Sequence, residues 1–163
     1  LKTINIPIVL DADGLFAIAG ETRILKDRAA PTILTPHMGE LSQLTGWDAK
    51  EIEKGKVQLA LDCAAQWKSI LLLKGYRSLV ALPSGELFVN PTGNPGMATA
   101  GMGDVLAGLI AGFLAQGLPA DKATVAGVYL HGLAGDRVAK QKGERGLIAS
   151  DVAKAIPEVM KNM

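Results

Sequence analysis

The feature that most constrains this chain is a glycine-rich run that leads directly into an apolar helical stretch. The run reads Gly-Asn-Pro-Gly-Met-Ala-Thr-Ala-Gly-Met-Gly-Asp over residues 93–104, and the apolar stretch covers residues 105–114. Glycine lets backbone N–H groups approach an anion closely, and a helix N-terminus adds unpaired donors and partial positive charge. The sequence therefore predicts a loop that binds phosphate oxygens at the start of a helix.

Asp104 is the last residue of this run. A carboxylate in an anion-binding loop repels phosphate, so it is unfavourable there unless it has a chemical task. One interpretation is a helix N-cap in a glycine-rich turn. The other is a base that takes the proton from a hydroxyl group as that hydroxyl attacks phosphorus. The small and kinked residues before Asp104 favour the second interpretation.

Apolar segments alternate with helical patterns along the chain, which predicts an α/β domain with a mostly parallel sheet. Buried-type strands are expected at residues 4–10, 32–35 and 70–73, followed by a hairpin at residues 79–82 and 87–89. Helices are expected at residues 15–19, 38–44, 48–67, 105–116, 120–142 and 150–160.

Helix ends carry their own signals. Asp48 with Glu51 resembles a capping box, and Ser150 is a suitable N-cap for the last helix. Pro157 is expected to kink that helix or to end it early, because proline removes a backbone donor.

Composition excludes several classes of function. A net charge of +1 and an aromatic content of 4% argue against a nucleic-acid partner, and no apolar run is long enough to cross a membrane. Cys63 is the single cysteine, so an internal disulfide is excluded and a buried thiol in an intracellular protein is expected. The chain opens on Leu1 and almost at once on a strand, so we expect that an upstream segment is missing.

Polar clusters fall at the predicted ends of strands, where open α/β sheets bind ligands. They are Asp11 with Asp13, residues 35–40, Lys74 with Gly75, and the glycine run. We expect the four clusters to share one cleft. Asp13 is expected on the substrate side of that cleft, although the two aspartates are also suited to capping the next helix.

His37 and Glu40 are three residues apart at the start of a helix, so they can share a face. Glu40 could hold water on Mg²⁺ and His37 could donate to a substrate, but both residues are also ordinary at a helix start. Lys74 either faces a nucleotide or emerges at the surface, and Ser78 adds a hydroxyl nearby. His131, in a helix rich in alanine and glycine, is expected to have a packing role.

Four motifs occur in a characteristic order: Val-Leu-Asp-Ala-Asp-Gly-Leu at 9–15, Leu-Thr-Pro-His-Met-Gly-Glu-Leu at 34–41, Leu-Lys-Gly at 73–75, and the run extended to 94–108. Together they closely resemble the ADP/ATP-dependent NAD(P)H-hydrate dehydratases of the ribokinase-like superfamily. The resemblance implies a ribokinase-like fold, of whose domain residues 1–163 would be the C-terminal portion. It also implies missing N-terminal strands, and in bacterial members an epimerase domain is often fused.

The family's activity implies a nicotinamide nucleotide repair reaction. NAD(P)H hydrate carries a hydroxyl at C6, which the enzyme phosphorylates with ADP or ATP before phosphate leaves and NAD(P)H is restored. We expect ADP rather than ATP, a cytoplasmic enzyme and a homotetramer. Two alternatives remain: a ribokinase-like kinase of a small molecule such as a vitamin precursor, and a nucleotide-binding module without catalysis.

The resemblance also assigns roles to residues. Asp104 would be the base at the substrate hydroxyl, His37 would contact the hydrate, and Glu40 would orient hydrated Mg²⁺. The nucleotide would be bound by residues that this chain supplies in two groups: Lys74, Gly75, Tyr76, Arg77 and Ser78, and the anion-binding backbone of Gly101, Met102 and Gly103. Ser78 departs from the threonine usual in the family but keeps the hydroxyl.

Overall fold

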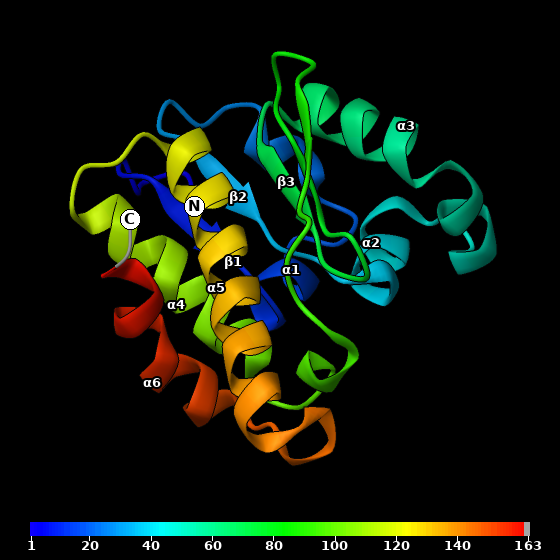
Figure 1. Ribbon diagram of the computed structural model, residues 1–163. Helices are drawn as coiled ribbons and strands as arrows, with labels where there is room; N and C mark the ends of the chain where they lie inside the picture. The colour runs from blue at the N-terminus through cyan, green and yellow to red at the C-terminus, as the bar shows by residue number, and fades with distance from the viewer. Residues whose placement is uncertain (162–163) are drawn as a thin grey trace.

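The computed structural model describes residues 1–161, which form three layers with a five-stranded sheet in the middle (Figure 1). The strands are β1 (Ile8–Leu10), β2 (Thr32–Leu34), β3 (Ile70–Leu73), β4 (Leu79–Ala81) and β5 (Leu87–Val89). They lie in the order β1-β2-β3-β4-β5. The first three are parallel and the last two form an antiparallel hairpin, so the predicted α/β class and mostly parallel sheet are confirmed.

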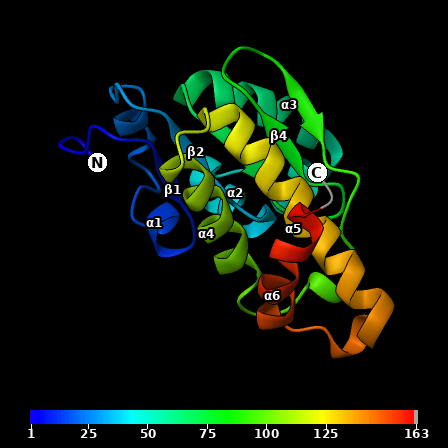
Figure 2. The same ribbon diagram turned by 60° about the vertical axis from the view of Figure 1, so that its left-hand side comes forward.

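Side chains of the central strands alternate between two cores, as strand geometry requires. Ile33, Leu72 and Val80 face the core under the C-terminal helices, whereas Leu34 and Leu71 face the other core. The C-terminal layer contains α4 (Met102–Ala115), α5 (Ala120–Lys142) and α6 (Ala149–Met160). The opposite layer contains α1 (Asp13–Phe16), α2 (Met38–Thr45) and α3 (Ala49–Trp67), and Figure 2 shows the two layers on either side of the sheet.

Short 3₁₀ turns complete the chain at η1 (Thr22–Leu25), η2 (Pro95–Met97) and η3 (Glu144–Gly146). None of the helices in residues 1–161 is both long enough and apolar enough to cross a membrane.

The first strand is shorter than predicted, because the carbonyl groups before it bond to a side chain. The Arg28 guanidinium donates to the carbonyl oxygens of Leu1, Ile4 and Ile6 at 2.7, 2.9 and 2.9 Å. Residues 4–7 therefore lie outside β1, which begins at Ile8. Helix α1 also begins two residues earlier and ends three residues sooner than expected.

The prediction that Ser150 caps α6 is wrong, and of the two effects expected of Pro157 an early end of the helix is wrong. The N-cap is Ile148, so Ser150 lies within the first turn and does not cap the helix. Pro157 lies inside the helix, which continues to Met160. Burial explains this continuation, since Ile156 and Val159, on either side of Pro157, pack into the core. Proline lacks a backbone N–H, so the helix loses one hydrogen bond, and only one turn of helix follows Pro157.

The start of α3 confirms half of the expected capping box. Asp48 is the N-cap, and its Oδ1 accepts from the Lys50 N–H at 2.8 Å. Among the hydrogen bonds of residues 1–161, none joins the Glu51 side chain back to Asp48. The helix is also interrupted at Gly55, where φ is −121°.

Candidate active site

The carboxyl ends of β1, β2 and β3 meet at one edge of the sheet, as the strand-end clusters predicted. Past β3, the Lys74 N–H donates to the Pro36 carbonyl at 2.8 Å, and His37 and Lys74 form a parallel bridge. The Lys74 side chain reaches across to Asp11 at the end of β1. Three of the four clusters are therefore in direct contact.

An ionic cluster of Lys74, Asp11 and Glu40 occupies this edge, and we call it the Lys74 cluster. Lys74 Nζ lies 2.6 Å from Asp11 Oδ1 and 3.6 Å from Glu40 Oε2. All three side chains are at most 20% exposed, so their charges are screened weakly by water. Sequence reasoning placed Asp11 only as a cap or a lining residue and missed its pairing with Lys74. The sequence did carry a signal for this pair, because Asp11 and Lys74 each directly follow a predicted parallel strand.

The fourth cluster, the glycine run, meets the Lys74 cluster at the start of α4. Gly101 is the N-cap with φ at +83°, a left-handed conformation that favours glycine. A Cβ atom at Gly103 would lie 3.2 Å from Asp11 Oδ2 and 3.4 Å from Lys74 Nζ. The N-terminus of α4 is therefore packed directly against the Lys74 cluster, so the four predicted clusters meet, and the cleft expected between them stays a prediction.

Asp104 lies in the first turn of α4, three residues past the N-cap, so its interpretation as the N-cap itself is wrong. Its side chain is exposed and makes no hydrogen bond or ion pair within residues 1–161. The backbone N–H groups of Gly103 and Asp104 also find no acceptor in this part of the chain. The first turn of α4 thus presents two free donors beside one free carboxylate, an arrangement suited to an anion next to a proton acceptor.

His37 and Glu40 form a reciprocal capping box at the start of α2. His37 Nδ1 accepts from the N–H groups of Gly39 and Glu40 at 3.0 and 3.2 Å, and Glu40 Oε2 accepts from the His37 N–H at 2.7 Å. The helix-start interpretation therefore holds for both residues. Because Nδ1 accepts, the neutral ring carries its proton on Nε2, and the imidazole is more than half exposed. His37 can cap α2 and still present a donor to a ligand.

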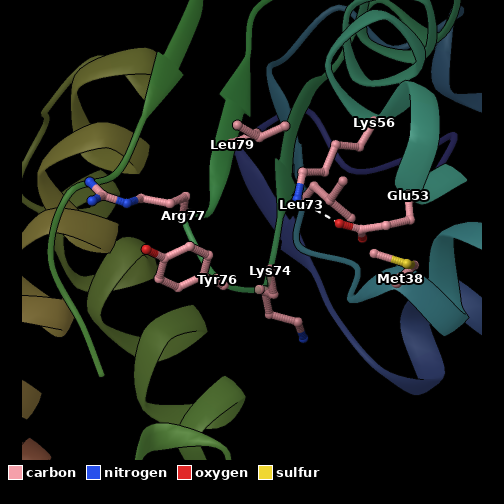
Figure 3. Close-up of a pocket in the computed structure, with 9 residues that line it drawn as sticks. Met38, Glu53, Lys56, Leu73, Lys74, Tyr76, Arg77 and Leu79 are labelled. Atoms are coloured by element: carbon pink, nitrogen blue, oxygen red, sulfur yellow. Dashed lines mark hydrogen bonds and ion pairs between the residues drawn. The ribbon is translucent and has the colours of Figure 1, made fainter. Parts of the chain in front are cut away.

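The turn after Lys74 shapes a small pocket of about 130 Å³ (Figure 3). Lys74, Gly75, Tyr76 and Arg77 line one side, and Met38, Glu53, Lys56, Leu73 and Leu79 complete it. Whole ligands occupy pockets of roughly 300–1,000 Å³, so this pocket has room for one part of a nucleotide only. In Figure 3 the Lys74 side chain extends away from Arg77, and its Nζ pairs with Asp11 outside the pocket lining.

Other predicted residues in this region are less constrained. Tyr76 is exposed, and the Arg77 guanidinium lies 5.6 Å from its ring centroid. The Ser78 hydroxyl donates to the Gly75 carbonyl at 3.0 Å, so it stabilises the turn. Asp13 begins α1 and is exposed, with no hydrogen bond or ion pair from its carboxylate within the described chain. The structure therefore brings Asp11, rather than Asp13, into contact with Lys74.

Two further titratable groups are buried, as expected from their apolar sequence surroundings. His131 is 7% exposed, and burial lowers its pKa to about 4, partly opposed by the nearby Met102 backbone. The imidazole is therefore neutral near pH 7. Burial raises the pKa of the Cys63 thiol to about 12, with a further contribution from the charge of Asp62.

Comparison with known proteins gives one consistent result. A sequence model of the family described as NAD(P)H-hydrate dehydratase matches residues 1–158. A bifunctional NAD(P)H-hydrate repair enzyme of Moorella thermoacetica is 47% identical over 163 residues, which is all of this chain and 31% of that protein. The chain thus spans less than a third of this relative.

Solved structures extend the likeness to the fold. The crystal structure of an ADP/ATP-dependent NAD(P)H-hydrate dehydratase from Bacillus subtilis, co-crystallised with ATP and Mg²⁺, superposes with a TM-score of 0.90 at 34% identity. The match covers 99% of this chain and 57% of that one. A ribokinase-like superfamily protein from Enterococcus faecalis gives a TM-score of 0.78 at 33% identity, covering 94% of this chain and 52% of that one. The predicted ribokinase-like fold is confirmed.

Proposed function

This chain belongs to the NAD(P)H-hydrate dehydratase family, and from that membership we propose that it takes part in the repair of hydrated nicotinamide nucleotides. The substrate is (S)-NAD(P)H hydrate, whose C6 carries a hydroxyl group. The hydroxyl oxygen attacks the terminal phosphorus of ADP, the bond to the leaving nucleotide breaks, and AMP departs. The C6 phosphoester then loses phosphate and a ring proton, which restores NAD(P)H.

The observation that carries this proposal is the meeting of the α4 N-terminus with the Lys74 cluster. Free N–H groups at Gly103 and Asp104 can donate to phosphate oxygens and stabilise the negative charge that develops on them. The exposed Asp104 carboxylate, in the same turn, takes the proton from the attacking hydroxyl. Phosphoryl transfer needs such positioning and charge stabilisation rather than a nucleophilic side chain.

The remaining residues divide between the two ligands. His37 would donate from Nε2 to the hydrate, and Asp13 would line the substrate side. We assign the nucleotide to Gly101, Met102 and Gly103 together with Lys74 and the turn formed by Gly75, Tyr76, Arg77 and Ser78. The pocket beside that turn supports this division, because Lys74, Gly75, Tyr76 and Arg77 all line it.

Mg²⁺ is part of the proposal because the site has an excess of negative charge. Asp11, Glu40 and Asp104 supply three carboxylates and Lys74 one ammonium group, and the nucleotide adds its phosphates. Magnesium is usually held by few carboxylates together with substrate phosphates and water. Glu40 would hold it through water, and the bound ion would neutralise charge on the phosphoryl group.

The test is an assay of the full-length protein with purified (S)-NADH hydrate, Mg²⁺ and either ADP or ATP. Recovery of NADH absorbance with release of phosphate is the expected result, with a higher kcat/KM for ADP than for ATP. A stable phosphoester without NADH would favour the small-molecule kinase. Nucleotide binding without any product would favour a non-catalytic module.

The proposal also covers the extent of the domain, the assembly of the full-length protein and its place in the cell. We propose that residues 1–163 are the C-terminal portion of one ribokinase-like domain, and that the full-length enzyme is a cytoplasmic homotetramer. Support for self-association comes from the last strand, β5, where Phe88 and Val89 are exposed beside an apolar groove of about 560 Å³. An exposed apolar edge strand is a template for pairing with another chain, and exposed apolar patches mark interaction surfaces. Sedimentation of the full-length protein tests the assembly.

A further inference from the structure

Helix α5 holds the start of the glycine run through contacts that the proposed reaction does not use. Gly132 touches the backbone of Thr92 and Gly93, and Gly135 lies against the Met97 side chain. The Thr92 hydroxyl donates to the Tyr129 carbonyl at 2.9 Å. One face of α5 is therefore fitted to the segment that leads into the anion-binding loop.

Asp136, on the same face, binds two successive residues of the run. Its Oδ2 accepts from the Gly93 N–H at 2.9 Å, and its Oδ1 accepts from the Asn94 side-chain amide at 2.9 Å. Two bonds from one carboxylate fix both the position and the rotation of the chain at this point. Gly93 has φ at +101°, a conformation that glycine adopts readily and other residues rarely do, so the bonds to Asp136 select it from the several that glycine allows.

Asn94, which Asp136 binds, also fixes the next turn of the chain. Its Oδ1 accepts from the Gly96 N–H at 3.1 Å and caps the η2 turn. Beyond η2, Ala98, Thr99 and Ala100 are exposed, and within residues 1–161 no side-chain hydrogen bond fixes them. The run is also held by packing, with Gly96 against the Glu144 backbone and Met97 against Gly135, but its side-chain hydrogen bonds come from Asn94 and Asp136 at its start.

We propose that Asp136 is a positioning residue for the anion-binding loop: through Gly93 and Asn94 it sets where the Gly101–Gly103 backbone meets the nucleotide phosphates. The proposal rests on the proposed function for the identity of that anion. It requires a side chain with two acceptors, because both groups that face Asp136 are N–H donors. An asparagine would turn a donor toward one of them.

The hydrogen-bond pattern offers a sharp test, because the two side chains can be exchanged. In the N94D/D136N double variant, the amide introduced on α5 would donate to the carboxylate introduced in the run, and the amide oxygen would accept from the Gly93 N–H. The introduced carboxylate would still accept from the Gly96 N–H. All three bonds are thus restored, and only the bond between the side chains at 94 and 136 runs in the opposite direction. Either single variant leaves two like groups facing each other. The matched control is D121N, the same change at the opposite end of α5.

Calorimetric titration of the full-length protein with ADP and Mg²⁺ is the main readout, beside kcat and KM. We expect D136N and N94D each to weaken ADP binding about tenfold or more, as the loss of a charge-assisted bond predicts. Misplacement of the loop should also lower kcat/KM by up to about 10²-fold. The double variant should return to within about threefold of wild type, and D121N should bind like wild type.

A role limited to folding would lower the thermal midpoint of D136N and leave its ADP affinity unchanged below the transition. That result, or a double variant no better than the singles, overturns the proposal. If D136N does not fold, Asn94→Ala carries the test, since it keeps the Gly93–Asp136 bond; wild-type ADP affinity in that variant overturns it as well. A wild-type protein that binds ADP but leaves the hydrate unchanged refutes the proposed function alone, because binding still reports on Asp136.

Discussion

Gly132 allows the contact between α5 and the glycine run to be tested by one methyl group. A Cβ atom at position 132 would lie 2.8 Å from the Thr92 carbonyl carbon and 2.9 Å from the Gly93 nitrogen, well inside the usual contact distance of about 3.5–4.0 Å. Both atoms belong to the backbone, so no side-chain rotation can relieve the overlap. Gly132→Ala must therefore displace either α5 or the run.

Two opposing terms set the size of the effect. Overpacking of this kind costs about 1–3 kcal/mol, whereas replacing a glycine inside a helix by alanine gains about 0.5–1 kcal/mol. The expected net loss in the free energy of unfolding is therefore about 0–2.5 kcal/mol. For a chain of this size each kcal/mol lowers Tm by about 2–4 °C.

Gly108→Ala is the matched control, since Gly108 lies inside α4 and a Cβ atom there would meet nothing within 4 Å. It should stabilise the protein by about 0.5–1 kcal/mol. Urea unfolding followed by circular dichroism measures both variants, and equal m values would show that the same cooperative transition is compared. If Gly132→Ala stabilises the protein as Gly108→Ala does, the close approach of α5 to the run is refuted.

Three further predictions concern the site and its surroundings. Asp104→Asn should lower turnover by at least about 10²-fold with ADP affinity within a few-fold of wild type, and near-normal turnover would remove Asp104 from the mechanism. Lys74→Ala should raise the KM for nucleotide more than the KM for the hydrate, and His37→Ala should do the reverse; equal effects on one ligand would contradict the division of the site. The pKa of His131 in the folded state is about 4, below its ordinary 6.5, so between these two values the unfolded chain binds a proton that the folded chain does not. The free energy of unfolding should therefore fall by up to about 3 kcal/mol as the pH drops from about 6.5 through 4. Urea unfolding at several pH values should show this loss, and His131→Gln should reduce it.

The sequence predicted most of what depends on neighbours along the chain. Residues 70–73 and 120–142 were predicted with the bounds that β3 and α5 have, because strand and helix periodicities are local properties. The glycine run was predicted to lead into a helix, and α4 begins there, since glycine content and an apolar helix are both visible in one segment; anion binding stays a prediction. The meeting of the polar clusters was also predictable, because the carboxyl ends of parallel strands lie at the same edge of a sheet.

The predictions of an earlier start for the first strand and of an early end for the last helix were in error where a local sequence preference competed with a contact from a distant part of the chain. Residues 4–7 have strand-like composition, but Arg28, more than twenty residues away, binds carbonyl groups from that end of the chain. Pro157 was expected to kink the last helix or to end it early; the early end is wrong, because burial of Ile156 and Val159 in the core favours continuation of α6 to Met160. In both cases tertiary contacts outweighed a preference worth only a few kcal/mol.

The pairing of charges was decided by the tertiary structure alone. Asp11 and Lys74 are 63 residues apart, and Gly93 and Asp136 are 43 apart. Composition and periodicity determine which faces are buried, so they fix the layers and the edge where polar side chains emerge. They carry no information on which of several carboxylates at that edge reaches a given donor. That choice depends on ångström-scale differences in strand register and helix placement, which only the packed core determines.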